Sequence, residues 1–202
     1  MRIRGLVAAV CAALAAPAAA WATVLLTQEE ALRLAFPGAT VEAHSAFLTE
    51  EQRRAAKALS GEEDLPSALV RYYAATKDGR AAGEAYFDTH VVRTMSETVM
   101  VVVSPEARIL RVEVLSFSEP EEYMPRPKWY EQFQGKPLDD ELSLKRSIRP
   151  VSGATLTARA TTDAARRVLA IYRVLHPPAP ASAPATPSSP PAARGSGAGA
   201  GR

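Results

Sequence analysis

The sequence predicts a single α+β domain in which an antiparallel sheet is flanked by helices. A central group of β-rich segments is separated by short turns, without the alternating helices that a parallel sheet requires. Two helix-start signals precede these segments, and a long amphipathic pattern follows them. Residues 23–176 are long enough for one domain with a sizeable core, and we expect the domain to occupy that range.

The two N-terminal helices are predicted from their capping boxes. Thr27 with Glu30, and Thr49 with Gln52, have the spacing at which a threonine and a side chain three residues later cap a helix reciprocally. Pro37 is expected to stop the first helix, and the second runs to Leu59 before a Ser-Gly pair.

Four strands are predicted in the middle of the chain. Residues 70–75 and 81–88 form a hairpin, because the Lys-Asp-Gly-Arg stretch at 77–80 is a typical tight turn. Residues 97–104 contain an unbroken apolar run and are expected to be a buried strand. Residues 108–117 alternate and are expected to be a half-buried partner of that strand.

A loop and a final helix complete the predicted domain. Prolines after Phe117 exclude a central strand there, so a long loop is expected. A short helical stretch ending at Gly135 is expected to supply aromatic surface through Trp129, Tyr130 and Phe133. The final helix is predicted from an apolar stripe, with most arginines lying off it; the stripe consists of Ala160, Ala164, Val168, Ile171 and Leu175, and the arginines are Arg159, Arg166, Arg167 and Arg173.

Both ends of the chain are predicted to lie outside the domain. Residues 1–22 have a positive start, a short apolar core and an Ala-x-Ala site, as in a cleaved signal peptide, and the core is too short to span a membrane. Export to the periplasm or cell envelope is therefore expected. The only cysteine, Cys11, lies in this leader, which excludes disulfides and thiolate metal sites from the mature chain. Residues 177–202 are rich in Pro, Ala, Ser and Gly and are expected to be a disordered tail.

Charge and histidine content exclude several function classes. The chain has 24 basic and 22 acidic residues, and the leader removes two arginines, so no nucleic-acid partner is indicated. His44, His90 and His176 lack the spacing of a metal site, and His90 is expected to be a surface residue. Ser152 is not in a G-x-S-x-G context, so a hydrolase is disfavoured and no catalytic residue is predicted.

The most informative segment is residues 148–159, which leads into the final helix. Gly153 allows close backbone approach to a ligand, and the small Ala154 adds little bulk. The first amides of a helix are unpaired donors at the positive end of its dipole, so an anion is stabilised there. Hydroxyl donors are supplied by Ser152, Thr155 and Thr157. From the residues alone, anion binding and ordinary capping by these side chains both remain open.

The stretch Ser-Gly-Ala-Thr-Leu-Thr at 152–157 resembles the flavinylation motif of the FMN-binding domain family. That family includes the FMN-carrying subunits of the sodium-pumping NADH:quinone reductase and of the Rnf electron-transport complex. The resemblance extends to residues 23–38, 83–88 and 99–119, to the Phe-Gln-Gly-Lys stretch at 133–136, and to the final helix.

The resemblance implies a carrier of covalent FMN that transfers electrons outside the cytoplasm. A flavin transferase is expected to join the FMN phosphate to Thr155 through a phosphoester. The other implied partners are an unidentified redox donor and acceptor, either within a membrane electron-transport complex or outside one. Near the flavin ring, the resemblance implies Glu119 and Tyr123, with Lys136 as a cationic partner. The implied cofactor-binding residues around the ester are Ser152, Gly153, Ala154, Leu156 and Thr157.

One position departs from the family pattern. An acidic residue often stands three positions before the motif serine, and this chain has Arg149 there. If the transferase reads that acid, the ester would form poorly. The alternative is a non-covalent FMN-binding or structural module on the same fold.

Overall fold

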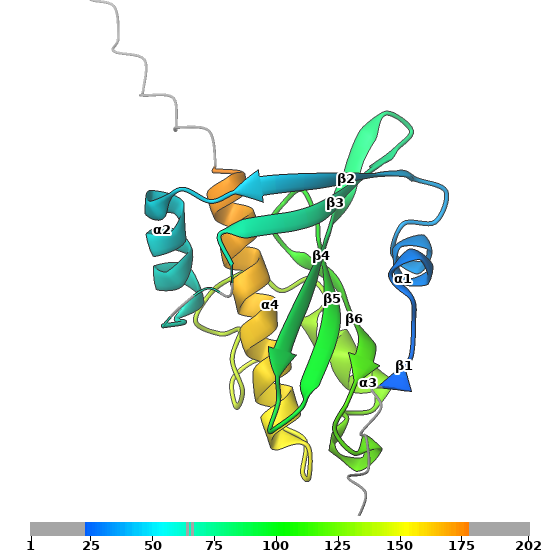
Figure 1. Cartoon of the computed structure of the whole chain (residues 1–202), viewed down its shortest axis with the longest axis vertical. Coiled ribbons are helices and arrows are strands. Elements are labelled where there is room, and N and C mark those ends of the chain that lie inside the picture. Colours follow the sequence, from blue (N-terminus) through cyan, green and yellow to red (C-terminus); the bar gives the residue numbers. More distant parts are fainter. Residues whose placement is uncertain (1–22, 64, 66, 178–202) are drawn as a thin grey trace, which may run out of the picture.

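The computed structural model describes residues 23–63, 65 and 67–177, so the expected signal peptide and almost all of the expected tail lie outside it. Six strands form one antiparallel sheet in the order β1-β6-β5-β4-β3-β2. Four α-helices accompany the sheet, which confirms the predicted α+β class (Figure 1). The elements are β1 Thr23–Val24, α1 Gln28–Ala35, β2 Thr40–Phe47, α2 Glu50–Ser60, β3 Leu69–Lys77, β4 Arg80–Val91, β5 Ser96–Val103, β6 Ile109–Phe117, α3 Pro127–Tyr130 and α4 Thr155–Leu175, with 3-10 turns η1 Glu121–Tyr123 and η2 Glu131–Phe133.

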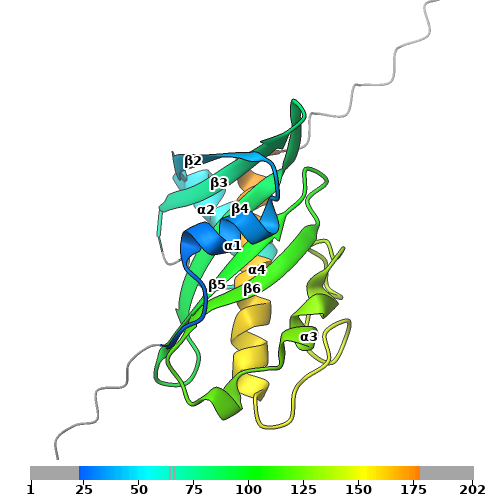
Figure 2. The ribbon, with the colours of Figure 1, turned by 90° about the vertical axis from the view of Figure 1, so that its right-hand side faces the viewer.

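The central strand β5 is buried on both faces, which explains its unbroken apolar sequence. Val99, Val101 and Val103 pack into the core beneath α4, whereas Met100 and Val102 pack into a second cluster that includes residues of α1. Figures 1 and 2 show α4 and α2 on one side of the sheet and α1 on the other. A strand between two layers must be apolar at successive positions rather than at alternate ones.

The local turn and capping signals are confirmed. Thr27 and Thr49 both form complete capping boxes, and Gly61 ends α2 in the left-handed conformation. The β3–β4 turn has positive φ at Asp78 (52°) and Gly79 (73°), the conformation that matches the twist of a two-residue hairpin.

Strand β2 is absent from the sequence-based prediction. It is an edge strand paired only with β3, and none of its residues is buried. A polar, mostly exposed edge lacks the apolar periodicity by which strands are recognised, so hydrogen bonding to β3 decides its structure. Strand β1, with two residues paired to the end of β6, is too short for a pattern.

Two expectations about side-chain burial are wrong. Trp129, Tyr130 and Phe133 lie in the main core instead of forming aromatic surface. Helix α4 is buried on more than the single face that the apolar stripe predicted, because both α2 and the sheet pack against it. Its buried residues include Arg167, which was expected to lie off the buried face, whereas Ala160, Ile171 and Leu175 of the expected stripe are only half-buried.

Within the described part of the chain, no helix is both long enough and apolar enough to cross a membrane.

Candidate functional site

Three segments meet at the end of the molecule where α4 begins, at the bottom of Figure 1. They are the β4–β5 turn at residues 92–95, the loop at 118–125 after β6, and the turn at 151–154. The loop contacts the β4–β5 turn through Glu119 and the helix through Thr157. Residues that are far apart in the sequence therefore form one surface around the start of α4.

The turn before α4 leaves the helix start open. Gly153 has φ +84°, and a Cβ atom built there would meet nothing within 4 Å. Ala154 is the N-cap residue, and no side chain caps the helix. This contradicts the ordinary capping interpretation: neither Ser152 nor Thr155 acts as the threonines of α1 and α2 do.

The first amides of α4 form a candidate anion site. Among the described residues, the amides of Thr155, Leu156 and Thr157 have no hydrogen-bond acceptor, and the first intrahelical bond runs from Ala158 to Ala154. Free amides at the positive end of a helix of 21 residues favour a negatively charged group. A phosphate fits this donor set because its oxygens accept several hydrogen bonds at once.

The two threonines of the motif have different environments. Thr155 is exposed, and its Oγ1 donates to the carbonyl of Val151 at 3.0 Å. Thr157 is 1% exposed, and its Oγ1 donates to the carbonyl of Tyr123 at 2.5 Å. Thr155 therefore presents an accessible hydroxyl beside the free amides, whereas Thr157 fixes the 118–125 loop to the helix.

Glu119 has a structural contact that the sequence did not reveal. Its Oε1 accepts hydrogen bonds from the amides of Thr94 and Met95 at 2.7 and 2.9 Å, and from the Thr94 hydroxyl. The backbone hydrogen bond from Thr94 is the main cause that lowers the pKa of Glu119 below its usual value. The carboxylate thus joins the loop to the β4–β5 turn, and its predicted place beside a flavin ring stays a prediction.

Tyr123 lies at the junction of the three segments. Its carbonyl accepts the Thr157 hydrogen bond, and the guanidinium carbon of Arg93 lies 4.3 Å from the centre of its ring. Arg93 was not foreseen, because nothing in its local sequence distinguishes it from any other charged residue in a turn. The cation–π contact orders the ring at the edge of the site.

Lys136 lies apart from the other predicted residues. It lines a separate concavity with Arg149, and its backbone is hydrogen-bonded to Phe133 and Ile109. No hydrogen bond or ion pair between described residues joins it to the turn at 151–154.

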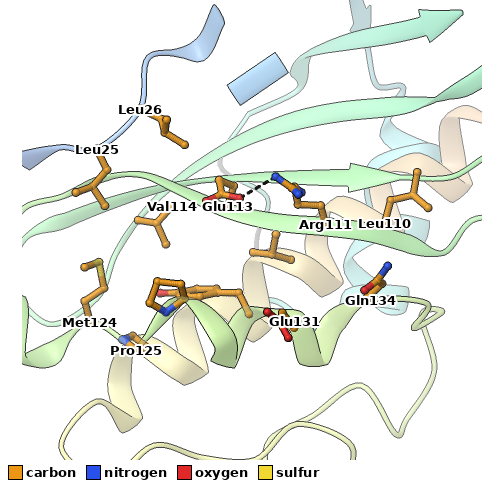
Figure 3. Close-up of a pocket in the computed structure, with 13 residues that line it drawn as sticks. Leu25, Leu26, Leu110, Arg111, Glu113, Val114, Met124, Pro125, Glu131 and Gln134 are labelled. Atoms are coloured by element: carbon orange, nitrogen blue, oxygen red, sulfur yellow. Dashed lines mark hydrogen bonds and ion pairs between the residues drawn. The ribbon is translucent and has the colours of Figure 1, made fainter. Parts of the chain in front are cut away.

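Two further cavities lie on the domain. One, of about 330 Å³, lies beside the first turns of α4 and is lined by Leu156, Arg159, Val91 and Val92 among others. The other, of about 420 Å³, lies between β6 and α3. Figure 3 shows Met124 and Pro125 of the loop across this second cavity from Leu25 and Val114, with an ion pair between Arg111 and Glu113 on its strand wall.

A buried charged cluster contributes to the wall of the first cavity. The sequence predicted that His90 is a surface residue, and this prediction is wrong. One ring nitrogen of His90 lies 2.9 Å from Asp88, and the other lies 2.9 Å from Glu97. Arg167 donates to both carboxylate oxygens of Asp88 at 2.8 Å. Burial opposes the charge on His90, but the hydrogen bonds to Asp88 and Glu97 outweigh it and raise its pKa to about 9.

Comparison with protein families gives a match that covers most of this site. Residues 96–170 match the family described as the FMN-binding domain. The chain contains an FMN-binding domain. The matched range of the FMN-binding domain begins at β5 and includes the 118–125 loop, the motif and most of α4. The resemblance seen in the sequence is thereby confirmed, and FMN is the cofactor that the domain indicates. Searches among curated proteins and among solved structures give no match.

The surroundings of the histidines bear on two other kinds of site, a metal site and a hydrolase site. Among the residues that the structure describes, no group of three or more His, Cys, Asp or Glu side chains is arranged to hold a metal ion. His90 is held by two carboxylates, and His176 is hydrogen-bonded to Glu84, so neither contacts Ser152.

Proposed function

We propose that the protein carries FMN covalently, through a phosphoester to Thr155, and transfers electrons outside the cytoplasm. The observation that carries this proposal is the exposed Thr155 hydroxyl at an uncapped helix start with free amides. FMN is the indicated cofactor, and its phosphate is the part that a helix N-terminus stabilises.

The geometry supports Thr155 as the acceptor in preference to Thr157. In the attachment reaction, Thr155 Oγ bonds to the flavin phosphorus and loses its proton, while the bond from phosphorus to the donor's leaving group breaks. The Thr157 hydroxyl is buried and hydrogen-bonded to Tyr123, so a transferase would have to open the loop to reach it.

The protein residues divide the task of holding the cofactor. The phosphodiester keeps one negative charge, which the amides of Thr155, Leu156 and Thr157 stabilise together with the helix dipole, by about 1 kcal/mol. The flavin supplies the redox chemistry, and the protein sets its position and electrostatic environment. Tyr123 and Glu119 are proposed as neighbours of the ring, because the loop that holds them is bonded to the motif helix.

Export and partners complete the proposal. The leader expected at residues 1–22 would carry the chain to the periplasm or cell envelope, where lost FMN is not readily replaced and a covalent bond retains it. A flavin transferase would attach the cofactor, and a donor and acceptor, within or beside a membrane electron-transport complex, would exchange electrons with it.

The test is co-expression with a flavin transferase, followed by denaturing electrophoresis and intact mass. The wild-type chain should give a fluorescent band and a mass increased by FMN less one water. Thr155→Ala should abolish both signals while leaving the fold intact, because it removes one exposed hydroxyl. Thr155→Ser should retain the flavin and serves as the matched control, because it keeps a hydroxyl at the same position.

Denaturation-resistant flavin in Thr155→Ala would disprove the assignment of the ester. A dark wild-type band beside an active transferase control would instead favour the non-covalent FMN-binding module and would implicate Arg149. Absorbance of the native protein after addition of FMN would then show whether the free cofactor binds.

A further inference from the structure

A basic concavity lies on the segment that leads to the flavin motif. Its volume is about 490 Å³, and its lining contains three cationic residues, Lys128, Lys136 and Arg149, and no acidic residue. Trp129, Gln132 and Ser147 complete the lining. We refer to these six residues as the basic surface.

The three cations are not neutralised within the domain. Their side chains form no ion pair or hydrogen bond with any other residue that the structure describes. Several other arginines do have such partners: Arg33 pairs with Glu29, Arg111 with Glu113 and Arg146 with Glu141. Three uncompensated charges around one hollow produce a local positive potential that attracts an anionic group.

The backbone beneath the basic surface is held in place. The Trp129 indole donates to the Arg149 carbonyl at 2.6 Å, and the Arg149 amide donates to Gln132 Oε1 at 2.9 Å. Lys136 is fixed by hydrogen bonds to Phe133 and from Ile109, at 3.1 and 2.9 Å. The backbone that carries Lys136 and Arg149 is therefore already ordered before a partner binds, which reduces the entropy lost on binding.

Overall charge does not account for this surface. Four of the 24 lysines and arginines lie outside residues 23–177, so that range holds 20 basic residues against all 22 acidic ones. A domain with a slight excess of negative charge concentrates three free cations at one place. Such a local patch steers a partner of opposite charge and fixes its orientation.

We propose that the basic surface is the docking site for an acidic face of a redox partner protein. Arg149 is six residues before Thr155, so their Cα atoms are at most about 22 Å apart even in an extended chain. A partner bound at Arg149 would therefore lie within about 22 Å of the backbone of Thr155, where the flavin is attached. This inference depends on the proposed function only for the redox role of the partner; the docking itself does not require the flavin.

The composition of the surface favours a protein over a lipid bilayer or nucleic acid. None of the large exposed apolar residues lines it, so no side chain is available for insertion into a membrane. Three cations are also fewer than the four to eight of a typical polybasic lipid site and than the contacts of a nucleic-acid footprint. The lining combines a Trp with two uncharged polar side chains, and this composition is typical of the polar rim of a protein–protein interface.

The test measures binding of a fluorescein-labelled poly-glutamate chain of about 20 residues, as a probe of acidic protein surfaces, by anisotropy at low and physiological salt. Lys128→Glu/Lys136→Glu/Arg149→Glu should weaken binding at least tenfold. The matched control is Arg54→Glu/Arg80→Glu/Arg173→Glu, which changes the net charge by the same amount. These three arginines form no ion pair among the described residues. The affinity of this control for the probe should stay within twofold of the wild-type value. Circular dichroism verifies the fold of each variant, and Arg149→Glu alone serves if the triple variant does not fold.

Equal loss of binding in both triple variants, or no binding by the wild type, would overturn the proposal. Binding to vesicles of anionic phospholipid without binding to poly-glutamate would overturn it in favour of a lipid surface. Thr155→Ala should bind the probe as the wild type does. A wild-type chain that lacks covalent flavin after co-expression with an active transferase, and yet binds the probe normally, would contradict the proposed function without contradicting the docking site.

Discussion

At the scale of single residues, the same side-chain type has opposite roles within the motif. Thr155 and Thr157 are two positions apart on α4, yet one is exposed and the other is sealed against the Tyr123 carbonyl. The sequence identified both as hydroxyl donors and, through the family resemblance, selected Thr155. Only the packing of the 118–125 loop explains why the second threonine is unavailable.

His90 gives a prediction for pH dependence. Its pKa is raised from 6.5 to about 9 by Asp88 and Glu97, against the effect of burial, so the folded state binds a proton that the unfolded chain releases. The resulting stabilisation, about 3 kcal/mol, is complete below pH 6.5 and is lost as the pH rises through 9. Urea denaturation of the wild type at pH 6, 8 and 10 should show this decrease.

The control for this prediction is His90→Gln, which keeps a polar side chain between the two carboxylates but does not titrate. Its stability should be lower at pH 6 and nearly constant from pH 6.5 to 9. A wild-type protein equally stable at pH 6 and pH 9 would contradict a charged His90.

At the scale of elements, the three main helices begin in different ways. Helices α1 and α2 have complete capping boxes, whereas α4, the longest helix, has none. The capping boxes were predictable because their geometry depends on residues three positions apart. The open start of α4 was not, because the sequence offered three hydroxyl side chains as possible caps.

The turn before α4 predicts a specific effect of Gly153→Ala. The added Cβ meets no atom within 4 Å, so the cost arises from the positive φ alone and should be about 1–2 kcal/mol of unfolding free energy. Gly61→Ala is the matched control, with φ +81° and equally open surroundings at the end of α2. Chemical denaturation should give similar losses for both, while only Gly153→Ala should reduce flavin incorporation. Equal incorporation in both variants would show that the shape of the turn does not matter for attachment.

At the scale of the whole molecule, a buried ion pair connects α4 to the sheet. Arg167 of α4 donates two hydrogen bonds to Asp88 of β4 and one to Glu62, beyond the end of α2. Hydrogen bonds from His90 and Arg167 outweigh the effect of burial and lower the pKa of Asp88 to about 2. The pair therefore fixes the helix that carries the flavin motif relative to β4.

Arg167→Leu should reduce the unfolding free energy by about 3–5 kcal/mol, because it leaves Asp88 buried without its main partner. Arg159→Leu, at an exposed arginine of the same helix, should change it by less than about 0.5 kcal/mol. Thermal or urea denaturation at pH 7 provides the comparison. The double variant Arg167→Leu/Asp88→Leu should recover part of the loss, and a fully additive loss would mean that the two residues do not interact.

The sequence by itself determined the helices with capping boxes, the hairpin at Asp78-Gly79, the buried strand β5, the family and the FMN cofactor. These depend on residues close together in the chain, or on a motif that is contiguous, so no knowledge of distant contacts was needed. The tertiary structure alone decided that β2 is a strand, that Trp129 and Arg167 are buried, and that His90 lies between two carboxylates. It also decided which threonine is exposed and brought Lys128, Lys136 and Arg149 to one surface. Each of these properties arises from contacts between segments far apart in sequence, where burial and pairing outweigh local preference.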